Sequence, residues 1–224
     1  MRTPRSHPQD RSRPGRCVII AGSPEFVARE VRPDDYVIAC DAGYGHAVAA
    51  GIVPDLAMGD FDSFCGTVRP PTRVIRFGSV KDDSDTMLAV RHALSEGYRR
   101  FLLLGALGGR LDHQHSNICA GAHIAMHGGE CAMAGKDCDI YFVHNGKLTL
   151  EKKEGCFLSV FSFAELSRGV SLQGVKYPLS GAQLSADCPV GLSNEFETET
   201  ANIEVLDGLL IVFVAKACPA PTIS

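Results

Sequence analysis

The chain has 224 residues, of which 45% are hydrophobic and 21% charged, and its formal net charge is −4 at pH 7. This composition is typical of a soluble globular protein and argues against a broad basic surface for nucleic acid. No apolar run approaches the length of a membrane span, so helical membrane spans and a membrane partner are not expected. The length suits one large domain, or one large domain and one small.

The amino-terminal segment, residues 1–15, is rich in arginine, proline and serine. It lacks the apolar residues needed to bury a core, so it is predicted to be a disordered leader. It also lacks the apolar stretch of a secretory signal peptide, which favours a cytoplasmic location.

Residues 16–145 alternate short apolar runs with helical patterns, and this alternation predicts a parallel sheet with helices on its faces. The clearest helix is Thr86–Glu96, which Ser84 or Asp85 can cap at its start and Gly97 can end. The expected strands are Cys17–Ala21, Tyr36–Cys40, Leu56–Met58, Arg73–Phe77, Phe101–Leu104 and Ile140–Val143, and the other expected helices are Gly45–Ala50 and His115–His127.

Residues 146–218 show no helical pattern. Their expected strands are Lys147–Leu150, Phe157–Phe163, Gly169–Leu172, Ile203–Leu206 and Leu209–Val214. Asp207-Gly208 lies between two β-rich runs and predicts a tight hairpin there. The fold class expected is therefore α/β: a Rossmann-like parallel-sheet domain, 16–145, followed by a small all-β sandwich domain, 146–218.

The nine cysteines do not indicate a disulfide scaffold. Their number is odd and they include no Cys-x-x-Cys pair. Several lie in apolar segments, so we expect free thiols in a reducing compartment.

Four polar clusters lie beside the apolar segments of the first domain: Asp41, Gly59–Ser63, Lys81–Asp85 and Gly108–His113. Three of them follow expected strands directly or across a glycine-rich turn. Since ligands of open parallel sheets bind beyond the carboxyl ends of the strands, we expect these clusters to converge on one site.

Each cluster also has a purely structural interpretation. Asp60-Phe61-Asp62-Ser63 can form a turn in which side chains bond their own backbone. Lys81–Asp85 can be a solvated turn that feeds a helix cap, and Asp41 can be another cap. Gly108-Gly109-Arg110 can be a flexible loop. The coincidence of all four favours a functional site.

The residue types indicate phosphoryl-type transfer. Carboxylates bind Mg²⁺, which neutralises phosphate oxygens, while Arg110 and Lys81 can take the remaining phosphate charge. The chain has no P-loop motif, and no Gly-x-Gly-x-x-Gly follows the first strand, although Gly22 there can let the backbone approach a phosphate. His113 and His115 have no third ligand at zinc spacing, which favours packing or hydrogen bonding for them.

The ordered set of motifs resembles the thiamine pyrophosphokinase family. The motifs are Asp41-Ala42-Gly43, Gly59–Ser63, Lys81–Thr86, Leu104–His113, Gly174–Leu179 and Leu192–Phe196. Six motifs in this order are specific, and together they extend over nearly everything after the leader. The resemblance implies transfer of the pyrophosphate of ATP to the hydroxyl of thiamine, which gives thiamine diphosphate and AMP.

The resemblance also implies residue roles. It assigns Mg²⁺ to Asp60, Asp62 and Asp85. Asp41 completes the acidic catalytic pocket, and either Asp85 or Asp41 orients or deprotonates the attacking hydroxyl. The ATP-binding residues are Gly22, Lys81, Arg110 and Asp112, and the thiamine-binding residues are Tyr177, Ser193 and Asn194. The family implies a homodimer whose sites lie between one subunit's α/β domain and the other's β-domain.

Ala42 departs from the family's usual Asp-Gly-Gly, and the chain has no tryptophan to stack on thiamine. Three other functions match these residues less well. A haloacid-dehalogenase-like phosphatase also uses Asp-x-Asp after a strand, but Phe64 stands where Thr or Val is expected and Lys81 comes too soon. A non-catalytic nucleotide-binding sensor would not need the dispersed carboxylates. A metal-dependent glycosyltransferase shares Asp-x-Asp, but no residues here indicate sugar binding.

Overall fold

The computed structural model describes residues 13–29, 31–61, 66–78 and 83–217. Its helices are α1 (Gly43–Ala49), α2 (Asp85–Ser95) and α3 (Leu111–Met126). Its strands are β1 (Cys17–Ile20), β2 (Tyr36–Cys40), β3 (Leu56–Gly59), β4 (Arg73–Arg76), β5 (Arg100–Leu104), β6 (Glu130–Ala134), β7 (Cys138–His144), β8 (Lys147–Glu151), β9 (Cys156–Ser162), β10 (Leu166–Gln173), β11 (Leu179–Ser185), β12 (Asn194–Glu195), β13 (Thr200–Glu204) and β14 (Leu209–Lys216).

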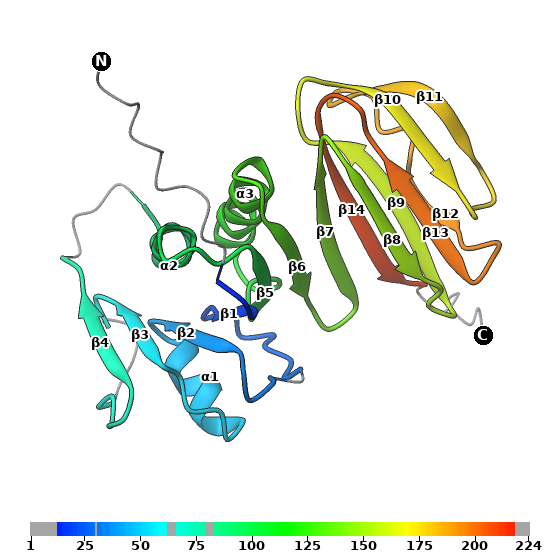
Figure 1. Ribbon diagram of the computed structural model, residues 1–224. Coiled ribbons are helices and arrows are strands. Elements are labelled where there is room, and N and C mark those ends of the chain that lie inside the picture. Colours follow the sequence, from blue (N-terminus) through cyan, green and yellow to red (C-terminus); the bar gives the residue numbers. More distant parts are fainter. Residues whose placement is uncertain (1–12, 30, 62–65, 79–82, 218–224) are drawn as a thin grey trace, which may run out of the picture.

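One sheet of ten strands runs from one end of the described structure to the other, in the order β12-β9-β14-β7-β6-β5-β1-β2-β3-β4 (Figure 1). From β6 to β4 all neighbours are parallel, which confirms the expected α/β half. β1 is buried on both faces, as the central strand of such a sheet should be.

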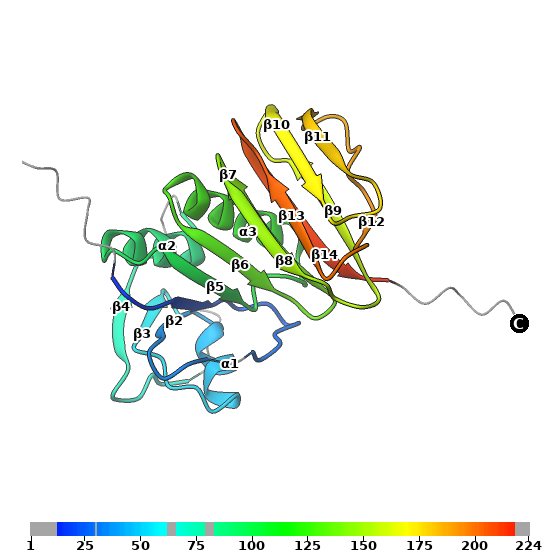
Figure 2. The same ribbon diagram turned by 45° about the vertical axis from the view of Figure 1, so that its right-hand side comes forward.

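The helices cover the two faces of this parallel half unequally. α2 and α3 pack with Cys17 and Ile19 of β1, whereas Val18 and Ile20 point toward the face on which α1 contributes Ala47. Figure 2 shows α2 and α3 on one side of the strands and α1 on the other. This alternation along β1 joins two apolar cores through one strand.

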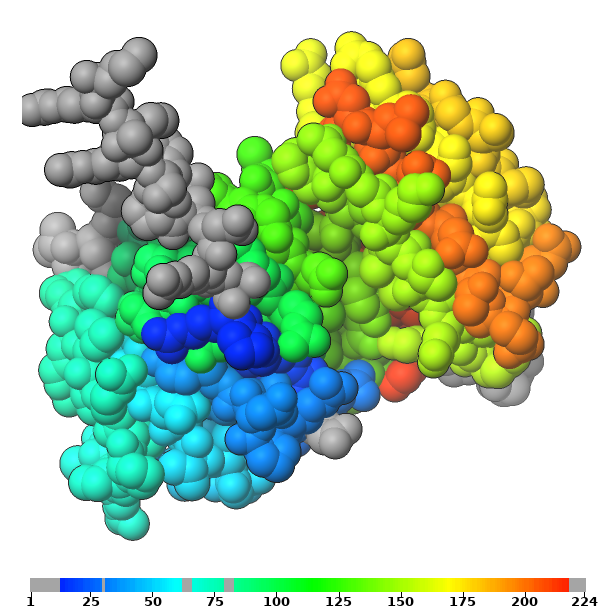
Figure 3. Space-filling view, viewed as in Figure 1, coloured from blue at the N-terminus to red at the C-terminus, as the bar shows by residue number. Residues whose placement is uncertain are grey.

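The second half is an antiparallel sandwich. Beyond β6 the long sheet continues through β7, β14, β9 and β12, and the four strands β11-β10-β13-β8 form a second sheet. Along β14, Leu209 and Ile211 join the core beneath α3, while Leu210 and Val212 join the core between the sheets. The long sheet is therefore continuous across the expected boundary at residues 145–146. The yellow to orange strands of the second sheet, β10, β11 and β13, lie away from the cyan β3–β4 end in Figure 3.

The hairpin predicted at Asp207-Gly208 is wrong. β13 pairs with β8 and β10 in the second sheet, whereas β14 pairs with β7 and β9 in the long sheet. The turn thus carries the chain from one layer of the sandwich to the other. Gly208 has φ +131°, and a Cβ there would lie 2.5 Å from the Ser167 hydroxyl, so glycine permits this close crossing.

Several element limits also differ from those predicted. α3 begins at Leu111, four residues before the expected start, because the glycine-rich turn leads directly into it. The strand expected at 203–206 is instead Thr200–Glu204. β6, β11 and β12 were not predicted.

The end of the predicted leader is bound to the α/β half. Arg13 donates from its backbone N–H to the carbonyl of Gly97, and its guanidinium bonds Glu96 at 2.7 Å. Residues 1–12 lie outside the described residues. Within the described ranges, no helix is long and apolar enough to cross a membrane.

Candidate active site

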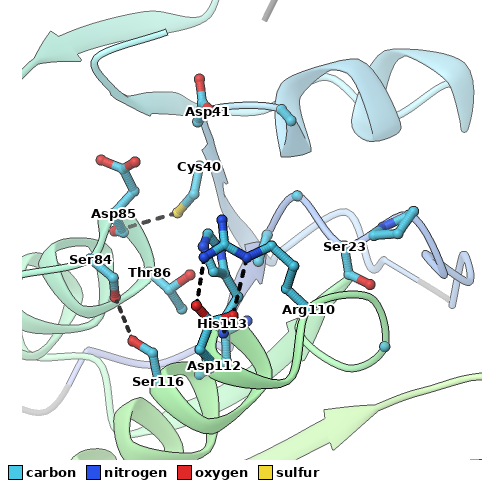
Figure 4. A pocket seen from close by; sticks show the side chains of 16 residues that line it. Ser23, Cys40, Asp41, Ser84, Asp85, Thr86, Arg110, Asp112, His113 and Ser116 are labelled. Atoms are coloured by element: carbon cyan, nitrogen blue, oxygen red, sulfur yellow. Dashed lines mark hydrogen bonds and ion pairs between the residues drawn. The ribbon is translucent and has the colours of Figure 1, made fainter. Parts of the chain in front are cut away.

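A cavity of about 540 Å³ lies at the carboxyl edge of the parallel strands, where the sequence predicted a site (Figure 4). It brings together five of the predicted site residues: Gly22, Asp41, Asp85, Arg110 and Asp112. They come from the ends of β1 and β2, the start of α2, the loop between β5 and α3, and the first turn of α3. The position follows the rule for open α/β sheets.

Asp41 lies directly after β2 in a left-handed conformation, with φ +45°. Its backbone N–H donates to the carbonyl of Met58 at 2.9 Å, so the end of β2 is tied to the end of β3. Gly59 closes β3 with φ +154°, and a Cβ there would come within 3.2 Å of the Asp41 Cβ. Asp60 follows at once, which places it at the same edge of the sheet although it does not line the cavity. A left-handed non-glycine residue at a cavity is a frequent mark of function.

α2 brings its first turn to the cavity. The Ser84 hydroxyl accepts a hydrogen bond from the Met87 N–H at 3.3 Å, which makes Ser84 rather than Asp85 the cap of this helix. Asp85 is thereby left at the first helical position, where the helix dipole favours a carboxylate. The Cys40 thiol contacts the Asp85 carbonyl at 3.6 Å and ties α2 to the end of β2.

The loop after β5 and the start of α3 supply the arginine. The Arg110 guanidinium binds the Asp112 carboxylate through two hydrogen bonds, of 3.1 and 2.5 Å (Figure 4). These bonds hold the pKa of Asp112 below its ordinary value and raise that of Arg110. Both side chains are largely exposed, so the pair is free to reorganise around an anion.

The cavity also exposes residues that the motifs had not assigned a role. Ser23, Thr86, Ser116 and Asn117 line it, and the Ser84 and Ser116 hydroxyls lie 3.3 Å apart. These neutral donors and acceptors carried no sequence signal of their own, because isolated serine and asparagine residues are common on any surface.

Two predicted residues, Asp62 and Lys81, lie outside the described residues. Among the described residues, no group of three metal-ligating side chains is close enough to hold an ion. The metal set Asp60, Asp62 and Asp85 therefore stays a prediction.

The predicted thiamine residues lie in the sandwich and do not line the cavity. Tyr177 is exposed at 60%, and Ser193 has a left-handed backbone with φ +55°. Asn194 is buried, and its amide oxygen accepts the N–H groups of Tyr177 and Glu195, each at 2.9 Å. Its amide nitrogen donates to the Tyr177 carbonyl at 2.8 Å. One amide N–H of Asn194 is left for other partners.

An open parallel sheet with carboxylates and an arginine at its carboxyl edge defines an α/β enzyme suited to a phosphorylated substrate. The family model "Thiamin pyrophosphokinase, catalytic domain" matches residues 27–132, and "Thiamin pyrophosphokinase, vitamin B1 binding domain" matches residues 146–210. The chain belongs to the thiamine pyrophosphokinase family and is an enzyme of that class.

Similar proteins agree with this assignment. The chain is 28% identical to thiamine pyrophosphokinase of Bacillus subtilis (strain 168) over 206 residues, which is 87% of this chain and 95% of the relative. The crystal structure of thiamine pyrophosphokinase from Bacillus subtilis matches with a TM-score of 0.83 and 26% identity, covering 91% of this chain and 100% of that one. That of a thiamin pyrophosphokinase family protein from Enterococcus faecalis matches at 0.77 and 25%, with the same coverage. The phosphatase and sensor alternatives receive no support from these matches.

Proposed function

We propose that this chain transfers the pyrophosphoryl group of ATP to the hydroxyl of thiamine, giving thiamine diphosphate and AMP. The hydroxyl oxygen attacks the β-phosphorus, the bond from that phosphorus to the α–β bridging oxygen breaks, and AMP leaves with that oxygen. The observation that carries this proposal is the convergence of Asp41, Asp85 and Arg110 on one cavity in a chain of this family.

Arg110 is suited to the triphosphate. Its planar fork can bind two phosphate oxygens at once, and its position at the start of α3 adds the favourable field of a helix N-terminus. When phosphate arrives, the bonds to Asp112 can be exchanged for bonds to ATP. A Cβ at Gly22 would lie only 3.0 Å from the Ala42 Cβ, so glycine lets the loop after β1 pass close to Ala42. Without a side chain, the Gly22 backbone can also approach the same phosphates.

The donor set fits a magnesium ion. Asp60 and Asp85 supply only oxygen ligands, from the end of β3 and the start of α2, which is the chemistry that Mg²⁺ prefers. We assign the ion to Asp60 and Asp85 together with Asp62. When bound, Mg²⁺ would neutralise phosphate charge and favour the departure of AMP.

Asp41 and Asp85 are the candidates for the acceptor side. Thiamine is a cation, so their carboxylates attract it and hold its hydroxyl near the β-phosphorus. One of them accepts a hydrogen bond from the hydroxyl and takes its proton as the oxygen attacks.

The candidate thiamine-binding residues can reach a cavity only if a second copy of the chain is present. Tyr177, Ser193 and Asn194 are candidates to bind the pyrimidine, but none of them lines the cavity of their own chain. We propose a homodimer in which these residues complete the partner's site. Exposed Leu111, between the cavity residues Arg110 and Asp112, and exposed Tyr177, Val190 and Leu192 in the sandwich supply apolar surface for such a contact.

We also propose that the protein acts in the cytoplasm, with no nucleic-acid or membrane partner. Its cysteines support this location, since all seven described ones are free thiols.

The test is to incubate the protein with ATP, Mg²⁺ and thiamine and to separate the products by chromatography. Thiamine diphosphate and AMP in equal amounts support the proposal, whereas ADP or free phosphate contradicts it.

Subunit mixing tests the shared site. Inactive Asp41→Asn and a Ser193→Ala/Tyr177→Ala variant should regain up to about a quarter of the wild-type activity when mixed, if half the dimers are mixed and each has one intact site. A monomer in solution would contradict the shared site.

A further inference from the structure

The loop that carries Arg110 depends on backbone conformations that only glycine adopts readily. Gly105, Gly108 and Gly109 have φ values of +59°, +88° and +71°. A Cβ on Gly105 would lie 2.5 Å from the carbonyl of Ala21, so the loop passes directly over the end of β1. Glycines give this loop high conformational entropy in the unfolded chain, and that entropy is lost on folding. Specific contacts are therefore needed to hold the loop in one conformation.

Two side chains of α3 reach back and supply these contacts. The Gln114 side-chain oxygen accepts a hydrogen bond from the Gly108 N–H at 2.8 Å. The Asn117 amide nitrogen donates to the Ala106 carbonyl at 2.9 Å. A backbone N–H can only donate and a carbonyl can only accept, so the partners themselves fix which way each amide points.

A third contact comes from the loop after β1. The Ser23 hydroxyl donates to the Leu107 carbonyl at 2.6 Å, and the Ser23 N–H donates to the Gly105 carbonyl at 2.9 Å. The loop is therefore held residue by residue up to Gly108, and beyond it the Gly109 N–H makes a longer hydrogen bond, of 3.5 Å, to the Glu25 carboxylate.

Among the described residues, the Arg110 side chain has no hydrogen-bond partner outside its own turn. This side chain is 71% exposed, and its guanidinium bonds Asp112, which lies two residues further along the same turn. A pair within one turn can set the direction of the guanidinium, but it moves with the loop. The position of Arg110 relative to β2 and α2 must therefore come from the loop backbone.

We infer that Gln114 is a positioning residue for pyrophosphoryl transfer, which fixes Gly108 so that Arg110 meets the phosphates of ATP in one orientation. This inference rests on the proposed function and deepens it. Misplacement of a charged group by about 1 Å can cost about 100-fold in rate.

The first experiment compares variants that differ in hydrogen-bonding polarity. Gln114→Glu keeps an acceptor for the Gly108 N–H, whereas Asn117→Asp replaces the donor to the Ala106 carbonyl by another acceptor. Both add one negative charge on the same side of α3. We expect kcat/KM for ATP to fall more for Asn117→Asp than for Gln114→Glu, and Gln114→Met, which has no acceptor, to lower it about 10-fold or more. KM for thiamine should change little in each.

The decisive experiment is a double-mutant cycle between Gln114→Met and Arg110→Ala. If Gln114 acts through Arg110, Gln114→Met lowers kcat/KM for ATP in the wild-type background and has little further effect in the Arg110→Ala background. An equal fold-loss in both backgrounds overturns the inference. Thermal unfolding monitors folding, and if Gln114→Met does not fold, the same cycle with Gln114→Ala, which also lacks the acceptor for the Gly108 N–H, decides.

The same double-mutant cycle can be measured with the affinity for ATP in the absence of thiamine. It separates the proposed transfer reaction from the proposed role of Gln114. A wild-type protein that binds ATP and shows the coupling, but makes no thiamine diphosphate, contradicts the proposed function and keeps the role of Gln114. Turnover without coupling contradicts the role of Gln114 alone.

Discussion

The carboxylate of Asp112 holds the guanidinium of Arg110 through two hydrogen bonds at the mouth of the cavity. Because this contact lowers the pKa of Asp112, the pair persists at every pH above about 4 and breaks only on stronger acidification. An activity change between pH 5 and 8 should therefore arise from other groups. In the proposed site, Asp112 orients Arg110 before ATP binds, and the phosphates would then replace Asp112 as its partner.

Arg110→Lys tests the need for a planar fork. Lysine keeps the charge but cannot bind two oxygens in one plane, so kcat/KM for ATP should fall about 10- to 100-fold. Steady-state kinetics with varied ATP measures this. Arg100→Lys, an exposed arginine at the start of β5, is the control and should stay within about twofold of wild type. Equal activity of Arg110→Lys and wild type would show that a planar guanidinium is not needed at this position.

Gly59→Ala tests the contact between β3 and Asp41. A Cβ at Gly59 would crowd the Asp41 side chain at 3.2 Å in a backbone conformation that disfavours alanine. We expect a loss of about 1 kcal/mol in unfolding free energy together with a large fall in kcat. The matched control is Gly51→Ala, which has φ +71° and no atom within 4 Å of its Cβ. It should lose stability by a similar amount and keep its kcat, as measured by urea unfolding and turnover. A normal kcat in Gly59→Ala would show that the position of Asp41 is not critical.

Asn194→Asp tests how the sandwich presents its candidate thiamine residues. Aspartate keeps the acceptor for the Tyr177 and Glu195 N–H groups but loses the donor to the Tyr177 carbonyl. KM for thiamine should rise about 10-fold while KM for ATP stays unchanged, because only the segments around residues 177 and 193 shift. Asn202→Asp is the control. Among the described residues, the Asn202 side chain only accepts a hydrogen bond, from the Thr149 hydroxyl, and aspartate can accept the same bond. A parallel rise in both KM values would point instead to general destabilisation.

His123→Gln tests a pH effect remote from the cavity. Burial lowers the pKa of His123, the charges of His127 and Arg91 act in the same direction, and Asp83 opposes them. The unfolded chain then binds more protons at His123 than the folded one, so stability falls as the pH drops through about 6.5. Urea unfolding at pH 7.5 and 5.5 should show a smaller loss for His123→Gln than for wild type. His144→Gln in β7 serves as the control, and the same loss in all three proteins would contradict this assignment.

The sequence predicted the parallel half well because its signals were local. An aspartate directly follows each of β2 and β3, and Gly97 follows the end of α2, so the residue patterns alone indicated which side chains meet at the sheet edge. β6 was missed because Glu130–Ala134 contains alanine, cysteine and methionine but no β-branched residue.

Interactions between distant segments could not be predicted in the same way. Asp207-Gly208 has the composition of a hairpin turn, but β13 and β14 pair with other strands in different sheets. The engagement of Asn194 by Tyr177, 17 residues away, likewise depends on how two loops meet. The bonds of Gln114 and Asn117 to the glycine-rich loop belong to the same class, since neither residue type signals such a role by itself.

The most direct test of the account follows one atom of ATP. ATP labelled with ¹⁸O at the α–β bridging position is incubated with Mg²⁺, thiamine and the protein. The masses of the products are then measured by mass spectrometry. Attack of the thiamine hydroxyl on the β-phosphorus predicts AMP that carries the label and thiamine diphosphate that does not. Formation of ADP, or AMP without the label, would contradict pyrophosphoryl transfer by this site.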